Sequence, residues 1–398
     1  MLQKRRPKRL TIVDPYFPWL GSGFTITEYH AYLDRFEDCR ILTLARELPW
    51  ADSRTMDDRL PPYEEAYPHY ASRIERYSGN KIAESEDFIY TIFQFGIAAI
   101  IDDLDLLGRP FGFTLYPGGG FFLDDPVTTE SLERIFSSPW FRFVIVTQRT
   151  TERYLLDNRL VPPEKIRFIF GVPVDTEQLR PLTKPKYPQE KSTFDICFVA
   201  HKYMPGGLDK GYDVFVSVAR LLAGRSPDYR FHVVGPWDKH DQELEGVEDN
   251  FTFYGTQPTT FFPPFHAGMD LLLAPTDKFR IHPGKFDGFP TGCCVEAALC
   301  GTPVLCTDPL GDNVAFEDGK EIVIIDRSPA NIAGLIERFR REPQALRAIG
   351  LHGEKRFRQV FGDQSQLLPR FQALEEFLVP QATRPRRGLV SVFGRRPS

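Results

Sequence analysis

Two carboxylates mark the segment of this chain whose residue types and spacing could do chemistry. Asp287 lies in a loop rich in glycine and proline, and Glu296 falls on the middle turn of the short helix that we expect after it. Thr291 is a capping type of residue at the start of that helix, and Gly301 stands where a left-handed conformation would end it. The apolar run 304–306 then begins a strand of the kind that is buried in parallel sheets. The sequence therefore predicts a loop, a helix and a strand in succession.

A loop that leads into a helix offers free backbone N–H groups and the positive end of the helix dipole, which together suit a diphosphate. A carboxylate beside such a site, such as Glu296, can accept hydrogen bonds from both hydroxyls of a ribose. The same segment also fits an ordinary connector of an α/β protein that carries an exposed glutamate. Both interpretations stay open on this segment alone.

Strands and helices alternate along the rest of the chain, which indicates doubly wound parallel sheets. Strands are expected at 10–14, 39–44, 111–116, 143–147, 166–170, 194–200, 230–234, 251–254, 271–274, 304–306 and 322–325. Helices are expected at 24–33, 131–136, 150–156, 211–222, 329–341, 343–360 and 371–378. Residues 48–85 suggest an irregular insertion or a pair of short helices, and 88–101 a buried helix or strand.

A polar, proline-bearing and aperiodic stretch, 176–193, is typical of a domain linker. We therefore divide the chain into Rossmann-like domains at 1–183 and 184–375, followed by a basic and flexible tail at 376–398. Ligands of such sheets bind outside the carboxyl ends of the strands, so the cleft between the domains is the expected site.

Glycine-rich turns follow two predicted strands of the first domain. Gly21 and Gly23 separate the first strand from its helix, and Pro117 is followed by three glycines that include Gly118 and Gly119. Glycine costs chain entropy but lets a ligand approach the backbone, so we count these four glycines as candidate substrate-binding residues. A floppy turn is the alternative for the triple glycine.

Composition bounds the class of protein. The 398 residues suffice for two to three domains, and 42% hydrophobic with 26% charged residues is ordinary for a soluble globular protein. A net charge of −5 gives no general attraction to nucleic acid, so no nucleic-acid partner is expected. None of the six cysteines forms a C-x-x-C pair, so we expect reduced thiols and no metal site. No stretch approaches the roughly 18 uncharged apolar residues of a membrane span, and the start is no signal peptide, which favours a cytoplasmic protein.

Basic residues crowd both ends of the chain without an intervening acid. They are Lys4, Arg5, Arg6, Lys8, Arg9, Arg384, Arg386, Arg387, Arg395 and Arg396. Such tracts suit peripheral contact with an anionic lipid surface, here the inner face of the membrane. Frayed and solvated termini are the alternative interpretation.

The stretch D-G-F-P-T-G-C-C-V-E-A-A-L-C-G-T-P-V at 287–304 resembles the donor-binding segment of family-4-type retaining glycosyltransferases of the GT-B fold. That family has the pattern acid-G-F-x…E-A-x-x-x-G-x-P-V. Further pieces follow in the family's order: F-V-A-H-K…D-K-G-Y-D at 198–213, V-V-G-P at 233–236, N-F-T-F-Y-G-T at 250–256, D-L-L-L-A-P-T at 270–276 and, in the first half, F-I-F-G-V-P-V-D at 168–175. The resemblance is strong over 194–327 and diffuse before residue 140.

The resemblance implies two Rossmann-like domains that face each other across a cleft, with the acceptor on the N-terminal side and a nucleotide-sugar donor in the C-terminal domain. It also implies transfer with retention of configuration, with no metal and with no cofactor beyond the nucleotide-sugar co-substrate. By motif, Glu296 would hold the donor ribose, Asp287 with Gly288 and Phe289 would face the sugar and the diphosphate, and Lys210 would neutralise the diphosphate. The remaining candidate substrate-binding residues are His201, Lys202, Gly235, Pro236, His282, Pro290 and Thr291.

Three departures from the family pattern affect these roles. Eight residues separate Asp287 from Glu296 instead of seven, so Gly288 takes the usual register and we expect Asp287 to reach the sugar only through a bulge. His201 and Lys202 stand where the family has an arginine, which leaves the second cation unassigned. The loop expected to bring a histidine to the reacting centre contains none, so no catalytic histidine is assigned.

The sequence therefore predicts a hexosyltransferase-type enzyme that moves a sugar from a nucleotide-diphosphate donor to a glycan or lipid-linked acceptor, in cell-surface polysaccharide synthesis. Two alternatives stay open. One is a nucleotide-sugar epimerase on the same fold, which would act without an acceptor. The other is a catalytically degenerate binding or assembly subunit, because a fold alone does not establish a function.

Overall fold

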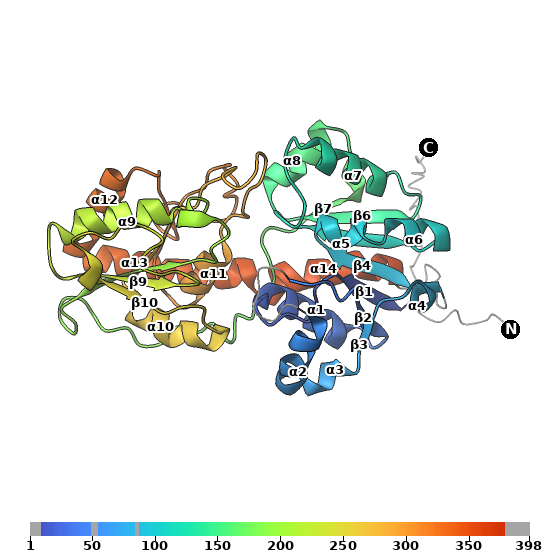
Figure 1. Ribbon diagram of the computed structural model, residues 1–398, viewed down its shortest axis with the longest axis horizontal. Helices are drawn as coiled ribbons and strands as arrows, with labels where there is room; N and C mark the ends of the chain where they lie inside the picture. The colour runs from blue at the N-terminus through green and yellow to red at the C-terminus, as the bar shows by residue number, and fades with distance from the viewer. Residues whose placement is uncertain (1–8, 49–54, 84–86, 379–398) are drawn as a thin grey trace, which may run out of the picture.

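The computed structural model describes residues 9–48, 55–83 and 87–378 and folds them into two α/β domains (Figure 1). Within these ranges the first domain has a parallel seven-stranded sheet of the order β3-β2-β1-β4-β5-β6-β7. Its strands are β1 (Leu10–Asp14), β2 (Cys39–Thr43), β3 (Ile74–Arg76), β4 (Phe88–Ile92), β5 (Phe111–Leu115), β6 (Phe141–Val146) and β7 (Ile166–Phe168). Its helices are α1 (Gly23–Arg35), α2 (Met56–Ala66), α3 (Pro68–Ala71), α4 (Gly79–Ala83), α5 (Gln94–Ala98), α6 (Ile101–Leu107), α7 (Pro126–Phe136) and α8 (Arg149–Asp157).

The second domain repeats this plan with a parallel sheet of the order β10-β9-β8-β11-β12-β13. Its strands are β8 (Phe194–Val199), β9 (Tyr229–Val234), β10 (Phe251–Phe253), β11 (Leu271–Ala274), β12 (Val304–Cys306) and β13 (Val323–Ile324). The helices that follow in sequence are α9 (Tyr212–Ala223), α10 (Phe262–Gly268), α11 (Gly292–Leu299), α12 (Pro329–Arg341), α13 (Pro343–Phe361) and α14 (Asp363–Leu378). The predicted pair of Rossmann-like domains is confirmed.

The region predicted as an irregular insertion or a pair of short helices is more regular than either alternative. Its described part, 55–83, forms α2, α3, α4 and the edge strand β3. The sequence of β3, Ile-Glu-Arg, gives no apolar run, because a three-residue edge strand buries little of its surface. Residues 88–101 divide into strand β4 and helix α5, so both interpretations of that stretch apply to a part of it.

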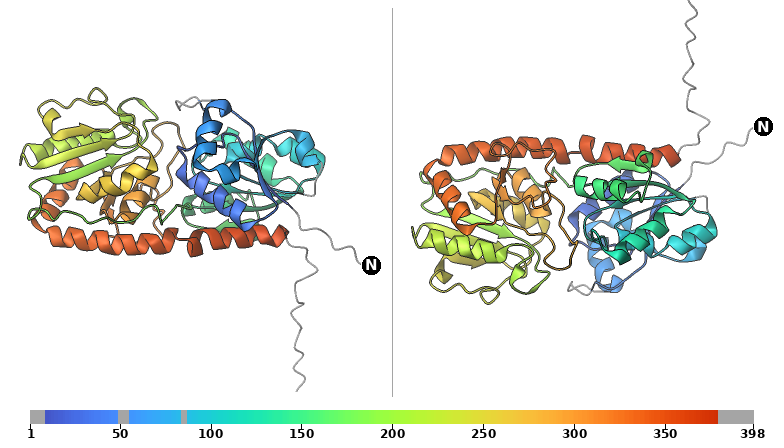
Figure 2. Two further views of the ribbon diagram at one scale, coloured as in Figure 1. Left: turned by 90° about the horizontal axis from the view of Figure 1, so that it is seen from below. Right: turned by 90° about the horizontal axis from the view of Figure 1, so that it is seen from above.

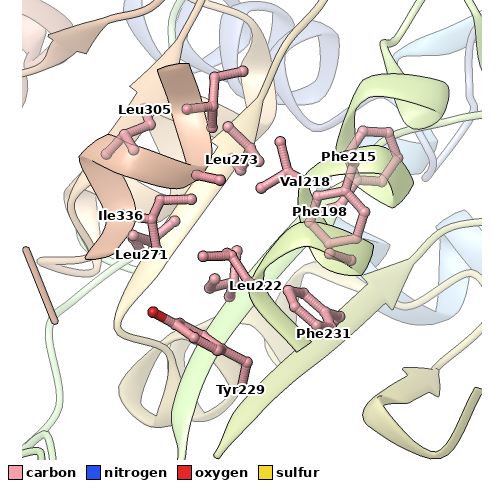
Figure 3. Close-up of a cluster of buried hydrophobic side chains, with 14 of the residues drawn as sticks. Phe198, Phe215, Val218, Leu222, Tyr229, Phe231, Leu271, Leu273, Leu305 and Ile336 are labelled. Atoms are coloured by element: carbon pink, nitrogen blue, oxygen red, sulfur yellow. The ribbon is translucent and has the colours of Figure 1, made fainter. Parts of the chain in front are cut away.

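The core of the second domain shows why its strands alternate between two apolar faces. Phe198 of β8 and Leu271 and Leu273 of β11 lie on the face covered by α9 and α12, where they meet Val218 and Ile336 (Figure 3). The intervening strand residues turn to the opposite face, which α10 and α11 cover. A fully buried side chain of this size stabilises the fold by about 1.5–3 kcal/mol. Burial on both faces therefore fixes the register of the strands, and with it the position of the loops at their ends.

Helix α14 departs from the domain division that the sequence suggested. Although it follows the second domain in sequence, its Ala373, Leu374 and Leu378 pack into a core cluster of the first domain. Figure 2 shows α13 and α14 following one another along one side of both domains. The apolar face of 371–378 has to be buried against one of the two domains. The position of this segment in the sequence does not determine which domain that is.

Apart from Arg9, the basic residues at the two ends of the chain lie outside the described residues. Across the described ranges, no helix combines the length and the apolar character needed to cross a bilayer.

Candidate functional site

A small recess opens at the carboxyl ends of β11 and β12, beside the start of helix α11. It is lined by Ala274, Thr276, Asp277, Lys278, Asp287, Gly288, Phe289, Thr291, Cys306, Thr307 and Pro309. Thr291 is the residue before the first turn of α11, as predicted, but its hydroxyl meets the thiols of Cys293 and Cys294 (3.2 Å each) and caps no backbone N–H. The position is the one where parallel sheets bind ligands.

Lys210 and Asp287, predicted to act together, are brought together from residues far apart in the chain. The Lys210 Nζ lies 2.5 Å from Asp287 Oδ2. Burial alone would lower the pKa of the Lys210 ammonium, but Asp287 and the ring of Tyr203 outweigh it and raise that pKa. Lys210 is therefore held in its charged form. An ammonium has three N–H donors, so the pair leaves donors for a ligand.

Glu296 differs from Asp287 in its hydrogen bonds. Its carboxylate is half-buried on α11, and no residue in the described ranges donates a hydrogen bond to it. Burial raises the pKa of Glu296 to about 7. A carboxylate without a protein partner can accept hydrogen bonds from a ligand, and a raised pKa is typical of functional sites.

Two lysine ammoniums lie near the ring of Tyr203, a residue that the sequence analysis did not select. The Lys210 Nζ lies 5.0 Å and the Lys285 Nζ 5.4 Å from the centre of the Tyr203 ring. The ring of His201 lies 4.7 Å from that of Tyr203, and burial followed by the charge of Lys210 lowers the pKa of His201. The buried Asp209 lies nearby, yet neither of its carboxylate oxygens has a hydrogen-bond partner among the described residues.

The loop that carries Lys285 and Asp287, residues 284–289, is held at both ends by the first domain. At one end the Leu123 N–H donates to the Gly284 carbonyl (3.0 Å), and at the other the amide of Gln148 both donates to the Phe289 carbonyl and accepts from the Phe289 N–H (3.1 Å each). Between them Phe286 is buried in a core cluster of the first domain. The position of Asp287 therefore depends on both domains.

Three more predicted residues of the second domain take other positions. Lys202 forms an ion pair with Asp241 (2.8 Å) and does not join the Lys210–Asp287 pair. Gly235 has φ +127°, and a Cβ at this position would lie 2.0 Å from the Ala200 carbonyl oxygen, so this glycine is required by close packing of two strand ends. Pro236 follows it and is half-buried.

Among the first-domain glycines, only the triple-glycine loop has a steric requirement near the site. Gly118 and Gly119 have φ of +78° and +57°, and a Cβ on Gly119 would lie 2.3 Å from the Phe93 ring. The Phe95 N–H donates to the Gly119 carbonyl (3.0 Å), so the loop is ordered and not a floppy turn. Pro117, at the start of this loop, lies close to Gly288 of the second domain. A Cβ built on Gly288 would be 3.6 Å from the Pro117 Cγ, which is van der Waals contact.

The remaining predicted residues lie at the edges of this arrangement. Gly21 and Gly23 are exposed at the start of α1, and a Cβ on Gly23 would meet no other atom within 4 Å. The His282 ring stacks on Phe122 of the first domain at 4.6 Å between ring centres. The cis peptide between Phe289 and Pro290 leads the loop into α11.

Gln148, Tyr203 and Lys285 are among the residues near the site that sequence reasoning missed, as are Asp209 and the recess residues Thr276, Asp277, Lys278 and Thr307. A positional signal existed for Gln148, because it directly follows the predicted strand 143–147 and so lies at a carboxyl end. Lys285 lies two residues before Asp287 in the same loop. In the part of the chain that the structure describes, no three His, Cys, Asp or Glu side chains are arranged to hold a metal ion.

The second-domain part of the site lies in a region that matches a known family model. Residues 194–341 match the family model described as glycosyl transferases group 1. Over 134 residues the chain is 26% identical to the 2-deoxystreptamine N-acetyl-D-glucosaminyltransferase of Niallia circulans, and over 158 residues 28% identical to the D-inositol 3-phosphate glycosyltransferase of Segniliparus rotundus. These matches cover 32% and 36% of this chain and 32% of each relative. The chain thus spans about a third of the length of the curated relatives it matches.

Similarity to solved structures extends over both domains. The crystal structure of Anabaena Alr3699/HepE in complex with UDP and glucose matches with a TM-score of 0.66, covering 93% of this chain and 98% of that one, at 15% identity. At this identity the likeness concerns the fold. It confirms the predicted GT-B arrangement of two Rossmann-like domains.

Proposed function

We propose that this protein is a glycosyltransferase that moves a sugar from a nucleotide-diphosphate-sugar donor to a glycan or lipid-linked acceptor. The single observation that carries the proposal is the half-buried Glu296 carboxylate, which lacks a partner among the described residues. It lies on the helix whose preceding loop holds Asp287 against Lys210, within the residues that match the glycosyl transferases group 1 model. A carboxylate for the ribose and a cation for the diphosphate are the two groups that such a donor requires.

In the proposed reaction the bond between the sugar's anomeric carbon and the diphosphate oxygen breaks, and negative charge grows on the diphosphate. The Lys210 ammonium, kept charged by Asp287, offsets that charge. The acceptor hydroxyl forms the new bond from the face that the diphosphate leaves, and its proton passes to the departing diphosphate oxygen. This route retains configuration and uses no metal, and both features belong to the proposal. It fits an enzyme of cell-surface polysaccharide synthesis.

UDP is the first donor nucleotide to test, because the structurally similar Alr3699/HepE was solved with UDP and with UDP-glucose. The purified chain would be screened by thermal shift against UDP, GDP, dTDP, ADP and CDP, each with and without Mg²⁺. A ligand present at about 100 times its Kd adds about 2.7 kcal/mol of stability, which is easily measured. We expect one nucleotide to stabilise the protein without metal.

The control variants give this screen its meaning. Glu296→Ala is expected to lose the shift, whereas Glu133→Ala, an exposed glutamate on α7 of the first domain, is expected to keep it. No shift with any nucleotide would contradict the proposal and favour a binding or assembly subunit. Conversion of the donor sugar in the absence of any acceptor would instead favour an epimerase.

A further inference from the structure

Two lysine ammoniums share one tyrosine near the recess, but only one of them is paired. Lys210 has its ion pair with Asp287 at 2.5 Å. Lys285 approaches the same Tyr203 ring at 5.4 Å, and no carboxylate in the described ranges forms an ion pair with it. Tyr203 itself is about half exposed (52%), Lys285 is half-buried, and the Lys210 side chain is largely covered (12%).

Lys285 is the cation of this group that no carboxylate in the described ranges contacts. Burial lowers the pKa of Lys285 and the charge of Lys210 lowers it further, whereas the charges of Asp287 and Asp209 raise it. Asp209, the other acid in the group, forms no hydrogen bond or ion pair with either lysine, since both of its oxygens lack a partner. Two neighbouring ammoniums with one paired carboxylate between them are stabilised when an anion binds, because it offsets the repulsion.

Contacts with the first domain fix the backbone position of Lys285 and the direction of its side chain. Gly284, just before it, has φ +81°, and a Cβ there would lie 2.0 Å from the Leu123 carbonyl oxygen, so the backbones of the two domains are in direct contact. Phe286, just after it, is buried against Phe121 with ring centres 6.0 Å apart. Because Phe286 points into the first domain, the side chains on either side of it, Lys285 and Asp287, turn back toward Tyr203 and Lys210 of the second domain.

We propose that Lys285 is the second cation of the donor site and binds the diphosphate together with Lys210. The inference rests on the proposed function, and it assigns the second positive charge to the loop before α11 instead of to the end of β8. Lys202, the lysine at the end of β8, is already neutralised by Asp241. Because the first domain holds the Lys285 loop in place, the diphosphate site is complete only where the two domains meet.

Calorimetric titration of single variants tests this assignment. The ligands are the nucleoside diphosphate that stabilises the chain most, UDP in the expected case, and the matching nucleoside, uridine. For Lys285→Ala we expect the Kd for UDP to rise about tenfold, as for loss of one charge-assisted contact, with the Kd for uridine unchanged. Lys285→Arg should restore most of the affinity, because it keeps the charge. Lys355→Ala, an exposed lysine on α13, should leave both values unchanged.

Each outcome separates this inference from the proposed function. If Lys285→Ala binds UDP as the wild type does, the inference is overturned while the proposed function stands. If Lys278→Ala, at the recess, shows the diphosphate-specific loss and Lys285→Ala does not, the second cation is Lys278 and the inference is wrong. If the wild type binds no nucleoside diphosphate, both fail. A melting temperature for Lys285→Ala close to that of the wild type excludes misfolding as the cause of any loss.

Discussion

Two groups of charged side chains in the described residues differ in their hydrogen bonds. In the tyrosine network of the first domain, the fully buried Glu28 carboxylate accepts hydrogen bonds from Tyr32, Tyr90 and Tyr116 at 2.6–2.8 Å. Arg370 of α14, also fully buried, lies 3.8 Å from Glu28 and donates to the Tyr116 hydroxyl (3.2 Å). This network ties the last helix of the chain to the first domain.

The other group, the site charges, consists of Lys210, Lys285 and Asp287, which lie around Tyr203 or pair with one another, and of Glu296 on α11. Lys285 and Glu296 lack a side-chain partner among the described residues, and only Lys210 and Asp287 are paired. Buried charges that the protein itself satisfies hold elements together, whereas charges left without partners are available to a ligand. The contrast therefore indicates a structural role for the tyrosine network and, under the proposed function, a binding role for the site charges.

The largest expected effect is on the tyrosine network. Arg370→Ala leaves the Glu28 charge buried without its cation, so we expect the free energy of unfolding to fall by about 3–5 kcal/mol. Thermal unfolding followed by circular dichroism measures it. The matched control is Arg35→Ala, which removes the exposed ion pair to Glu375 between the same two helices and should cost about 0–1 kcal/mol. Equal losses in the two variants would contradict the structural role.

Glu296 should dominate binding without affecting stability. Glu296→Gln is expected to weaken UDP-glucose binding by about 10- to 100-fold, because the amide accepts hydroxyl hydrogen bonds without the charge. Titration calorimetry measures the Kd, and Glu133→Gln on the exposed face of α7 is the control. A melting temperature that falls as in Arg370→Ala would show that Glu296 belongs to the structural class instead.

The pH dependence of binding gives a second test of the role of Glu296. With the pKa of Glu296 near 7, the free protein carries the carboxylate above that pH and the neutral acid below it. A ribose that donates to the carboxylate prefers the charged form, so the affinity for UDP-glucose should fall as the pH drops below about 7, by at most about tenfold per pH unit. The diphosphate diester of this donor stays ionised over the range. The slope should be absent in Glu296→Gln, and an identical slope in both proteins would refute the assignment.

A smaller effect is expected where the first domain holds the loop. Gln148→Ala removes two hydrogen bonds to the Phe289 backbone and should weaken UDP binding by about fivefold, since each neutral bond contributes about 1 kcal/mol at most. Hydrogen exchange at the Phe289 amide should become faster. Gln359→Ala, on α13 outside this contact, is the control, and unchanged exchange in Gln148→Ala would contradict the claim that the first domain positions the loop.

The smallest effect is expected for Lys202. Because its ammonium is paired with Asp241, Lys202→Ala should change the Kd for UDP by less than about twofold. Calorimetry beside Lys285→Ala gives a direct comparison of the two lysines. A tenfold loss for Lys202→Ala would place the second cation at the end of β8 after all.

Much of the fold and part of the site could be predicted from local patterns. Apolar runs located eleven of the thirteen described strands, because a strand buried on both faces requires consecutive apolar residues; the stretch of β4 stayed open between helix and strand, and β3, at the edge, gave no such run. The motif placed both Lys210 and Asp287 at the donor diphosphate, but it did not predict that the two side chains pair with each other. Gln148 and Tyr203 were not found, since neither belongs to a motif and their relation to the site depends on contacts between separate elements.

The sequence by itself determined the two α/β domains and the segment 284–307, because helix and strand periodicity and the capping residues act over short distances along the chain. Only the tertiary structure decided which charges meet. Lys202 and Lys285 are equivalent as residue types, yet one is neutralised by Asp241 and the other is left beside Lys210. Likewise α14 follows the second domain in sequence but packs on the first. Pairing and burial depend on contacts between distant residues, and the electrostatic energy of a side chain follows from its neighbours in space, not from those in sequence.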